Sequence, residues 1–459
     1  MIQKDEIEAK SKEFDLKISD VERDYVFGWL LKAIFENDYL AEILILKGGN
    51  AFRKGFFEDT RFSRDLDFSA QAALDIDRVQ AEINRACEHA AALSGIRFET
   101  ERNRLSEGRE IDGTKKSYKG QVYFQDFYGN PGTITISVRL DITEFDRLYL
   151  RPVSVPLLHP YSDGQECRVE LRCMALEELL ANKLKCLIQR RHSNDLYDLV
   201  YATFLAPPEG LDRRAVVSTF LQKTIFERSP GAAREILLGI PLAFFKGVWN
   251  KYIVCPAVSR MEFPAVEEAF QSTIHALFDP FGLGRATRAF VAAEHRNPIL
   301  DAGAARRLVR VTYGGVEREV EPYALAYKRR QDGAAFEYFY GYDRTGGSSG
   351  PGIKAFLPDK IQGVESTEVE FEPQFEIELG KAGESIGGGY FSRQRSGGSR
   401  SRHRIKTSAW PNNPFAQTYK VQCSTCGKVF TRKTRDQKIR KHKSPDGWDC
   451  FGRSGFQVW

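Results

Sequence analysis

Two aspartates on alternate positions of a short apolar run constrain this chain more than any other feature. Residues 61–68 read RFSRDLDF, with Asp65 and Asp67 two positions apart. In a β-strand, residues i and i+2 point to the same face, so the two carboxylates project together. Like charges this close repel each other, and a divalent cation between them is the usual remedy. The run therefore indicates either a metal-binding strand or, as the simpler alternative, a solvated strand face.

A pair of glycines precedes the aspartates. The stretch ILILKGGNAF predicts a short buried strand, a turn at Gly48 and Gly49, and the start of a helix. Glycines at such a turn let backbone N–H groups approach phosphate oxygens at a helix N-terminus. Each motif alone is weak, but a glycine pair 16 residues before an aspartate pair favours a site for phosphates and metal.

A third carboxylate, Asp141, interrupts the alternating pattern of the predicted strand ISVRLDIT. Three carboxylates on neighbouring strands suit two Mg²⁺ ions and a triphosphate. One metal would activate an attacking hydroxyl, and the other would hold the phosphates and steady the leaving pyrophosphate. Mg²⁺ bound by Asp65, Asp67 and Asp141 is therefore the predicted catalytic cofactor.

The segment EELLANKLKCLIQRRHSNDLYDL, residues 177–199, combines basic and acidic residues at helical spacing. Lys183 and Arg190 are seven residues apart, which is two turns along one helix face. Such a pair can clamp a triphosphate. Asp195 and Asp198 follow at i and i+3, and a charged helix surface with intrahelical ion pairs is the alternative.

Four segments together resemble the AbiEii-type nucleotidyltransferase family, the toxin halves of abortive-infection toxin–antitoxin pairs. They are KGGNAFRKGFF, RFSRDLDF, VRLDI and LEELLANKLKCLIQRRHSNDLYDL, which occur in order within residues 15–205. The resemblance implies an α/β (α+β) chain with a polymerase-β-like nucleotidyltransferase core. It also implies nucleotide transfer from an NTP, and some family members modify the 3′ end of tRNA.

The resemblance assigns a role to each matching residue. Asn50 stands where many members have Thr or Ser, and it can still donate a hydrogen bond. Arg61 and Ser63 are expected to orient other groups. The residues expected to act in catalysis are Asp65, Asp67, Asp141, Lys183 and Asp195. Those expected to bind the nucleotide are Gly48, Gly49, Asn50, Ser63, Lys183, Arg190 and Asp198.

The pattern of helical and alternating segments predicts five regions. Residues 1–45 are expected to be mainly helical, and IRFETER, GQVYFQDFYG and TITISVRLDITEF are expected to form strands. The predicted regions are a nucleotidyltransferase domain (1–205), a helical region (206–300), a small β-domain (301–380), a flexible basic linker (381–418) and a zinc-finger-like module (419–459).

Residues 306–372 are similar to a WYL domain, a small β-barrel of bacterial regulators that is thought to sense ligands. The basic positions of that family would fall on Lys354 and Lys360, where arginine is usual, and Pro358 replaces an expected apolar residue. Tyr340 and Tyr342 are candidates for stacking on a base, although a strand tyrosine more often belongs to the core.

The last 40 residues contain a cysteine–histidine pattern. Cys423, Cys426, His442 and Cys450 have the spacing C-x₂-C-x₁₅-H-x₇-C. Four N and S ligands without a carboxylate suit a structural Zn²⁺, which would help such a short segment to fold. A redox C-x-x-C or ordinary thiols are the alternatives.

The charge of the chain is unevenly distributed. Residues 381–459 carry 17 Lys and Arg against four Asp and Glu, whereas the rest of the chain carries more acidic than basic residues. A basic tail favours contact with nucleic acid. The absence of a long apolar run and of an apolar N-terminal segment predicts a cytoplasmic protein without a membrane partner.

The residues therefore predict an Mg²⁺-dependent nucleotidyltransferase, by analogy the toxin of a phage-defence toxin–antitoxin system with a separately encoded antitoxin. Its acceptor is expected to be RNA, with the 3′ end of tRNA as one candidate and DNA as another. Two alternatives stay open: a nucleic-acid-binding regulator whose transferase domain no longer turns over, and a transferase that modifies protein hydroxyls.

Overall fold

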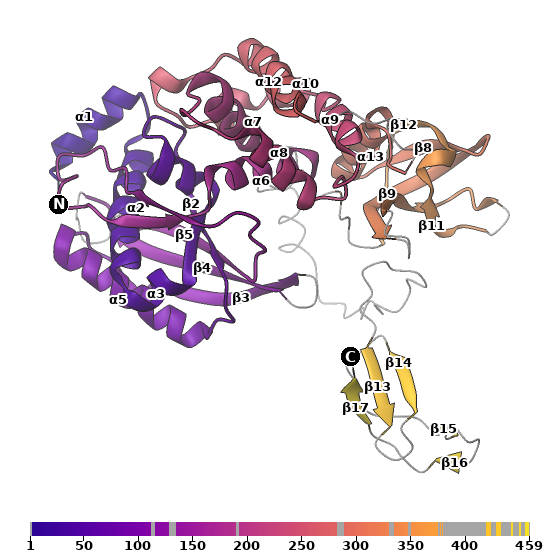
Figure 1. The fold of residues 1–459 in the computed structure, drawn as a ribbon, viewed down its shortest axis with the longest axis horizontal. Coiled ribbons are helices and arrows are strands. Elements are labelled where there is room, and N and C mark those ends of the chain that lie inside the picture. The colour runs from indigo at the N-terminus through magenta and orange to yellow at the C-terminus, as the bar shows by residue number, and fades with distance from the viewer. Residues whose placement is uncertain are drawn as a thin grey trace. The chain divides into compact units, whose positions relative to one another are not determined.

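The computed structural model describes most of the chain (Figure 1). The described residues are 2–111, 115–127, 135–189, 192–281, 289–329, 335–347, 350–374, 377, 379, 419–423, 428–432, 442–443, 449–450 and 455–458. The chain divides into two units, Met1–Ser396 and Gly397–Trp459, and each is described by itself.

A mixed seven-stranded sheet forms the centre of the first unit's N-terminal half. Its order is β3-β4-β5-β2-β1-β7-β6, in which β2 pairs in parallel with β5 and antiparallel with β1. The strands are β1 (Leu44–Lys47), β2 (Asp65–Ala70), β3 (Arg104–Ile111), β4 (Lys115–Gln125), β5 (Thr135–Glu144), β6 (Val153–Pro156) and β7 (Glu170–Cys173).

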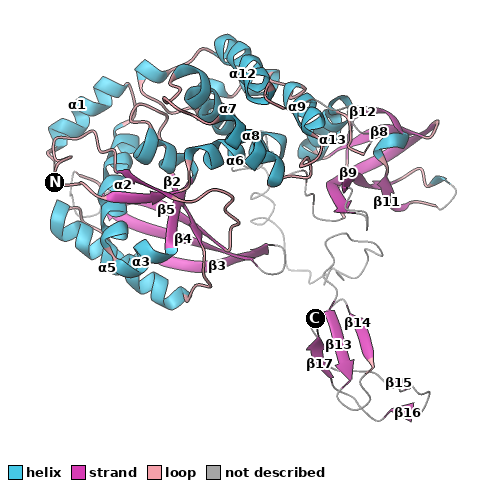
Figure 2. Ribbon diagram, viewed as in Figure 1, coloured by secondary structure: helices cyan, strands magenta, loops and turns pink. Residues whose placement is uncertain are grey.

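Helices cover the apolar face of this sheet. They are α2 (Ile18–Glu36), α3 (Asp38–Ile43) and α5 (Ile76–Ser94); α1 (Lys4–Phe14) packs on α2, and α4 (Gly48–Ala51) follows β1 directly. The long α2 packs on the sheet, where the rings of Phe35 and Phe68 lie 6.5 Å apart, and α5 packs against α2 and β3 (Figure 2). The helical prediction for α2 is confirmed, since its spaced apolar residues Tyr25, Trp29 and Ile34 are all buried.

One strand prediction is wrong. The segment IRFETER contributes only an isolated bridge between Phe98 and Phe124 and a short 3₁₀ turn at Thr100–Arg102. Beside that bridge, Glu99 and Arg97 hydrogen-bond to Tyr123 and Gln125 of β4, and the 3₁₀ turn then interrupts the pairing, so the continuous strand starts later, at Arg104. The predicted strands around LDFSA and ISVRLDIT are confirmed as β2 and β5.

A run of helices follows the first sheet. Those described are α6 (Leu176–Gln189), α7 (Ser193–Val200), α8 (Arg213–Gln222), α9 (Pro230–Leu238), α10 (Ala243–Lys246), α11 (Trp249–Tyr252), α12 (Phe263–Phe278) and α13 (Ala293–Ala305). α6 packs on α7 and α8, and α12 packs on α7, α8 and α9, so these helices share one core with the first sheet.

A second, five-stranded antiparallel sheet ends the first unit. Its order is β11-β10-β9-β8-β12, formed by β8 (Arg307–Tyr313), β9 (Val316–Arg329), β10 (Ala335–Asp343), β11 (Gly352–Phe356) and β12 (Ile361–Glu370). Among the described strands no pairing joins the edges β11 and β12, so the expected barrel is an open sheet here. A buried ion pair between Arg296 of α13 and Glu337 of β10 ties this sheet to the helices.

The second unit is built from short strands. β14 (Val429–Arg432), β13 (Tyr419–Cys423) and β17 (Gly455–Val458) form one antiparallel sheet in this order. β15 (His442–Lys443) pairs with β16 (Asp449–Cys450). Within the described residues of the whole chain, no helix is long and apolar enough to cross a membrane.

Candidate active site

The three predicted carboxylates lie on one face of the first sheet. Asp65 and Asp67 are two positions apart on β2, and the parallel register of β2 and β5 puts Asp67 directly opposite Asp141. Directly paired residues project to the same side of a sheet, so the three side chains share the face that α2 does not cover. They line a cavity of about 570 Å³ together with the glycine turn and Lys183.

The glycine turn lies against these carboxylates. Gly48 has a φ of +70°, and a Cβ atom there would lie 2.0 Å from Oδ2 of Asp67. A Cβ at Gly49 would lie 2.7 Å from Oγ of Ser63 and 2.9 Å from Nη2 of Arg61. Only glycine therefore fits at Gly48, because both its backbone angle and its space exclude a side chain.

Asn50 connects the turn to β2. Its Nδ2 donates a hydrogen bond to the backbone oxygen of Asp65 at 2.8 Å, and the side chain is fully buried. Its Oδ1 is buried without a hydrogen-bond partner. In this arrangement Asn50 holds the carboxylate strand, whereas the sequence assigned it to nucleotide binding.

The charged residues of the 177–199 segment pair with one another across the site. Nζ of Lys183 lies 3.0 Å from Asp195 and 2.7 Å from Asp198. Asp198 also accepts two hydrogen bonds from Arg61, at 2.7 and 2.8 Å. All four residues are buried or nearly so. The cluster thus fixes Lys183 in the cavity wall, and Arg190, its expected partner in the clamp, lies outside the described residues.

The electrostatics of the cluster favour its ionised form. Burial alone would lower the pKa of Lys183, but Asp198 and Asp195 outweigh burial and raise that pKa. The pKa of Arg61 is raised for the same reason, mainly by Asp198. A lysine neutralised by two carboxylates brings little net charge to a phosphate, so its contribution to the cavity is mainly a fixed hydrogen-bond donor.

The carboxylates of Asp65 and Asp67 have the opposite environment. Burial, together with the charges of Asp65 and Asp141, raises the pKa of Asp67 to about 6 against the opposing effect of Lys47. Burial also raises the pKa of Asp65, whose Oδ1 is buried without a hydrogen-bond partner. Ionising these groups together is therefore costly unless a cation lies between them.

The donor set fits Mg²⁺, which prefers carboxylate oxygens. Asp65, Asp67 and Asp141 supply such oxygens from one face, with an orphaned oxygen on Asp65. In the described part of the chain, however, no three Asp, Glu, His or Cys side chains converge closely enough to form a complete metal cage. The remaining ligands would come from water and substrate phosphates, as is usual for Mg²⁺.

Several cavity residues were not predicted from the sequence. Arg139 is two positions before Asp141 on β5, and its Nε lies 3.6 Å from Oδ1 of Asp65. Lys47, which does not line the cavity but is opposite Asp67 on β1, pairs with Asp146 at 2.8 Å. The ISVRLDIT alternation could have placed Arg139 on the Asp141 face. Phe62, Arg64, His192 and Asn194 also line the cavity from within the two segments already singled out, and Asp20, Lys251, Tyr252 and Val254 line it from distant segments.

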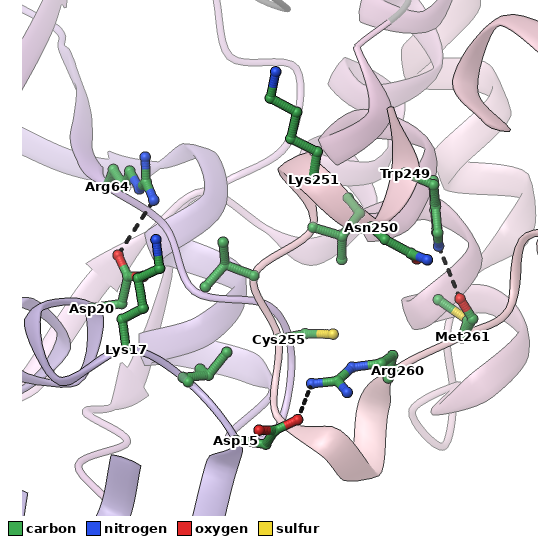
Figure 3. Close-up of a pocket in the computed structure, with 13 residues that line it drawn as sticks. Asp15, Lys17, Asp20, Arg64, Trp249, Asn250, Lys251, Cys255, Arg260 and Met261 are labelled. Carbon is green, nitrogen blue, oxygen red and sulfur yellow. Dashed lines mark hydrogen bonds and ion pairs between the residues drawn. The ribbon is translucent and has the colours of Figure 1, made fainter. Parts of the chain in front are cut away.

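A second pocket adjoins this cavity and shares Asp20, Arg64 and Lys251 with it (Figure 3). Its charged side chains are largely paired. Arg64 approaches Asp20 at 3.5 Å, and Arg260 binds Asp15 at 2.9 Å. None of Asp65, Asp67 and Asp141 lines this pocket.

The residues of the β-domain that are candidates for ligand binding either contact other protein groups or are exposed. Lys354 binds the buried carboxylate of Asp343 at 2.9 Å, and Lys360 is exposed. Burial alone would raise the pKa of Asp343, but Lys354 and neighbouring donors outweigh it and lower that pKa to about 2. Tyr340 is 2 % exposed and packs with Ala324, which supports its alternative assignment to the core.

The zinc prediction lies partly outside the described residues. Cys426 is not described, nor is the side chain of Cys450. Cys423 is buried at the end of β13, and the backbone register places His442 directly opposite Cys450. The ring of His442 lies 4.9 Å from that of Phe430.

Comparison with known proteins gives one family. Residues 29–293 match the model of the nucleotidyl transferase AbiEii toxin, type IV toxin–antitoxin system. Among solved structures, the nucleotidyltransferase toxin MenT4 from Mycobacterium tuberculosis H37Rv is 17 % identical, with a TM-score of 0.38 over 60 % of this chain and 89 % of that chain. No curated protein sequence matches.

Proposed function

We propose that this chain, which belongs to the AbiEii family of nucleotidyl transferase toxins, transfers a nucleotide from an NTP to a hydroxyl group of RNA. The family match makes the chain a nucleotidyltransferase of a type IV toxin–antitoxin system. The acceptor, the metal and the individual roles of the residues are part of the proposal, with the 3′ end of tRNA as the first acceptor to test.

The register of β2 and β5 carries this proposal. It sets Asp67 beside Asp141 on a sheet face that also holds Asp65, and the glycine turn closes the same cavity. A fully solvated strand face, the simpler alternative, would not raise the pKa of the half-buried Asp67 carboxyl group to about 6. Carboxylates with raised pKa values in a cavity are typical of functional sites.

The reaction is the attack of an acceptor hydroxyl on the α-phosphorus of an NTP. The new O–P bond forms as the bond to the pyrophosphate breaks, and the proton of the hydroxyl moves to Oδ of Asp141. Mg²⁺ held by Asp65, Asp67 and Asp141 would supply charge neutralisation for the phosphates and lower the pKa of the hydroxyl.

The other residues position these groups. Gly48 allows the triphosphate and Asp67 to lie close to the backbone of the turn, since a side chain there would displace Asp67. Asp195 and Asp198 hold Lys183 and Arg61 in the cavity wall. Water around the β- and γ-phosphates would be replaced by these fixed donors, which require little reorganisation during the reaction.

A transfer assay tests the proposal. Purified full-length protein is incubated with Mg²⁺, total bacterial RNA and each α-³²P-labelled NTP in turn, beside Asp65→Asn/Asp67→Asn protein. Label in a tRNA-sized band that the double variant does not produce is the expected result, and it also identifies the nucleotide.

Two results would change the proposal. Label in protein would keep the chemistry and replace the acceptor. RNA binding without transfer of any nucleotide would favour the nucleic-acid-binding regulator, once an added cell extract has been tested as a source of a missing activator.

The remaining modules are proposed to serve the same reaction. We infer that the WYL-like β-domain regulates access to the site and that the zinc-finger-like tail contacts nucleic acid. The charge of residues 381–459 supports the second inference, since basic segments bind polyanions with strong salt dependence. A type IV system also implies an antitoxin partner, which a pull-down with the neighbouring gene product would test.

A further inference from the structure

The sheet face that holds Asp65, Asp67 and Asp141 extends beyond Asp141 onto β4 and β3. Two rows of side chains cross this part of the face. In the first row, the strand registers place Asp67, Asp141 and Lys119 side by side on β2, β5 and β4. In the second row, Asp65 is followed by Arg139, then Gln121, then Arg104 on β3. Neighbouring strands are about 4.8 Å apart, so each row leads away from the carboxylates in steps of that length.

This part of the face is basic and open. We call Arg104, Lys119 and Arg139 the basic strip; all three residues are exposed, and the Arg139 side chain is 66 % exposed. Among the described side chains of β3, β4 and β5 on this face, Asp141 is the only acidic one. No described carboxylate forms an ion pair with Arg104 or Lys119. Arg104 donates hydrogen bonds to the backbone oxygens of Glu101 and Asn103.

The strip is continuous with the catalytic cavity. Arg104, Lys119 and Arg139 line a hollow of about 240 Å³, and Arg139 and Asp141 belong to both the hollow and the catalytic cavity. The glycine turn and Lys183 lie on the other side of the carboxylates, next to β1. An NTP held there leaves Asp141 accessible from the side of β4.

The neighbouring pocket of Figure 3 is the competing entrance. It contains Lys17 and Lys251, but none of the three carboxylates lines it, and its two arginines are paired with Asp15 and Asp20. A hydroxyl that gives its proton to Asp141 reaches that group through the hollow over the basic strip and not through this pocket.

We propose that the basic strip binds the backbone phosphates of a single-stranded nucleic acid whose 3′-terminal hydroxyl lies at Asp141. This inference rests on the proposed function and adds to it the path of the acceptor and the residues that bind it. Cations on three neighbouring strands, Lys119 in the first row and Arg139 and Arg104 in the second, suit the phosphates of a polynucleotide beside one reactive carboxylate, whereas a protein hydroxyl would need no such group. The ring of Tyr123, directly opposite Ser137 in the next row, lies on the same face, and the guanidinium of Arg102 lies 4.6 Å from its centre.

The first experiment measures transfer kinetics with the full chain. The variant Arg104→Gln/Lys119→Gln removes two exposed charges outside the NTP cavity. We expect the KM for RNA to rise about tenfold while kcat at saturating RNA and the Kd for Mg·NTP stay within twofold. The salt dependence of the KM should also weaken by about 1.4 logarithmic units per decade, since each single-strand phosphate contact contributes about 0.7.

A matched control removes the same charge from the other side of the sheet. Arg78→Gln/Arg85→Gln changes two exposed arginines on α5, which packs on the apolar face. Both the KM for RNA and its salt dependence should match the wild type. An equal effect of the two double variants would mean that only net charge matters, and would overturn the proposal.

The second experiment locates the RNA end without requiring turnover. A 20-nucleotide RNA with a 3′-terminal 4-thiouridine is irradiated with the protein, and the crosslinked peptides are identified by mass spectrometry. We expect crosslinks in β4 or β5. Crosslinks confined to the tail or to residues 249–261, or transfer of label to protein alone, would overturn the proposal.

The two experiments separate this inference from the proposed function. If the protein transfers nucleotide to RNA and the KM of Arg104→Gln/Lys119→Gln is unchanged, the proposed function is retained and RNA binding by the basic strip is rejected. If RNA crosslinks to β4 or β5 but no transfer occurs under any condition, RNA binding at this face is retained and the proposed transfer reaction is rejected.

Discussion

Gly48 and Asp67 occupy adjoining space, because a Cβ atom at Gly48 would lie 2.0 Å from Oδ2 of Asp67. The two residues are 19 positions apart in the sequence, yet β1 and β2 pair so that Lys47 is opposite Asp67. The glycine turn and the aspartate pair are therefore one structural unit. This contact explains why two motifs that are weak separately indicate a site together.

The variant Gly48→Ala should abolish transfer. The new methyl group would displace the Asp67 carboxylate, and the positive φ of +70° adds backbone strain of about 1 kcal/mol. We expect kcat to fall at least 100-fold with a small loss of thermal stability, measured by the transfer assay and by melting.

Gly210→Ala is the matched control. Gly210 also has a positive φ, +81°, but no atom lies within 4 Å of the position that a Cβ would take there. This variant should show the same small stability loss and full activity. Comparable activity in the two alanine variants would show that the contact with Asp67 is unimportant.

The variant Asp198→Asn should destabilise the protein by about 3–5 kcal/mol, because it leaves Arg61 and Lys183 as buried cations with one carboxylate between them. Urea unfolding measures this change. Asp15→Asn breaks the exposed pair with Arg260 and should change stability by about 0.5 kcal/mol or less. Similar values for the two variants would mean that the buried cluster has no special structural role.

Two carboxylates on one turn of α2 should respond to pH in opposite directions. Burial raises the pKa of Glu22 from 4.5 to about 7. The stability that protonated Glu22 contributes is therefore complete below pH 4.5 and is lost as the pH rises through 7. We expect Glu22→Gln to raise the free energy of unfolding by roughly 1–3 kcal/mol at pH 8 and to leave it unchanged at pH 4.5.

Asp24 is the opposite case. Burial alone would raise its pKa, but Arg53 and Lys54 outweigh burial and hold that pKa well below its usual range. Its contribution is complete above the ordinary value and is lost as the pH falls. Asp24→Asn should therefore lower the free energy of unfolding at pH 7 by about 3–5 kcal/mol. Parallel pH profiles for the two variants would contradict this assignment.

The tail should contain one zinc ion per chain. Elemental analysis of protein purified without chelator measures the metal content directly. Cys423→Ser and His442→Ala should each lower it well below one equivalent, whereas Cys255→Ser, at a buried thiol of the first unit, should not. Full zinc occupancy in both tail variants would exclude the predicted ligand set.

The elements around the catalytic face could be predicted because their signals are local. The alternation of ISVRLDIT and the turn chemistry of KGGN place β5, β1 and the start of α4 correctly. The spacing of Asp65 and Asp67 is itself enough to put them on one face once β2 forms.

The residues that pair with the predicted site residues could not be predicted, because contacts between distant segments determine the pairing. The prediction that Lys183 meets phosphate gave no sign that the fold also brings Asp195 and Asp198 to it. Lys354 was expected to meet a ligand, but β11 pairs with β10 and brings it to Asp343. A spacing pattern shows which face a charge occupies, but it does not show which neighbour neutralises it.

The most direct test of the account follows pyrophosphate. Wild-type protein, RNA, Mg²⁺ and labelled NTP are mixed, and released pyrophosphate and incorporated nucleotide are measured in the same samples, beside the isosteric variant Asp141→Asn. We predict one pyrophosphate released for each nucleotide incorporated. In Asp141→Asn, the rates of pyrophosphate release and of nucleotide incorporation should both fall at least 100-fold, while the melting temperature is preserved. Equal turnover in Asp141→Asn, or release of orthophosphate in place of pyrophosphate, would contradict it.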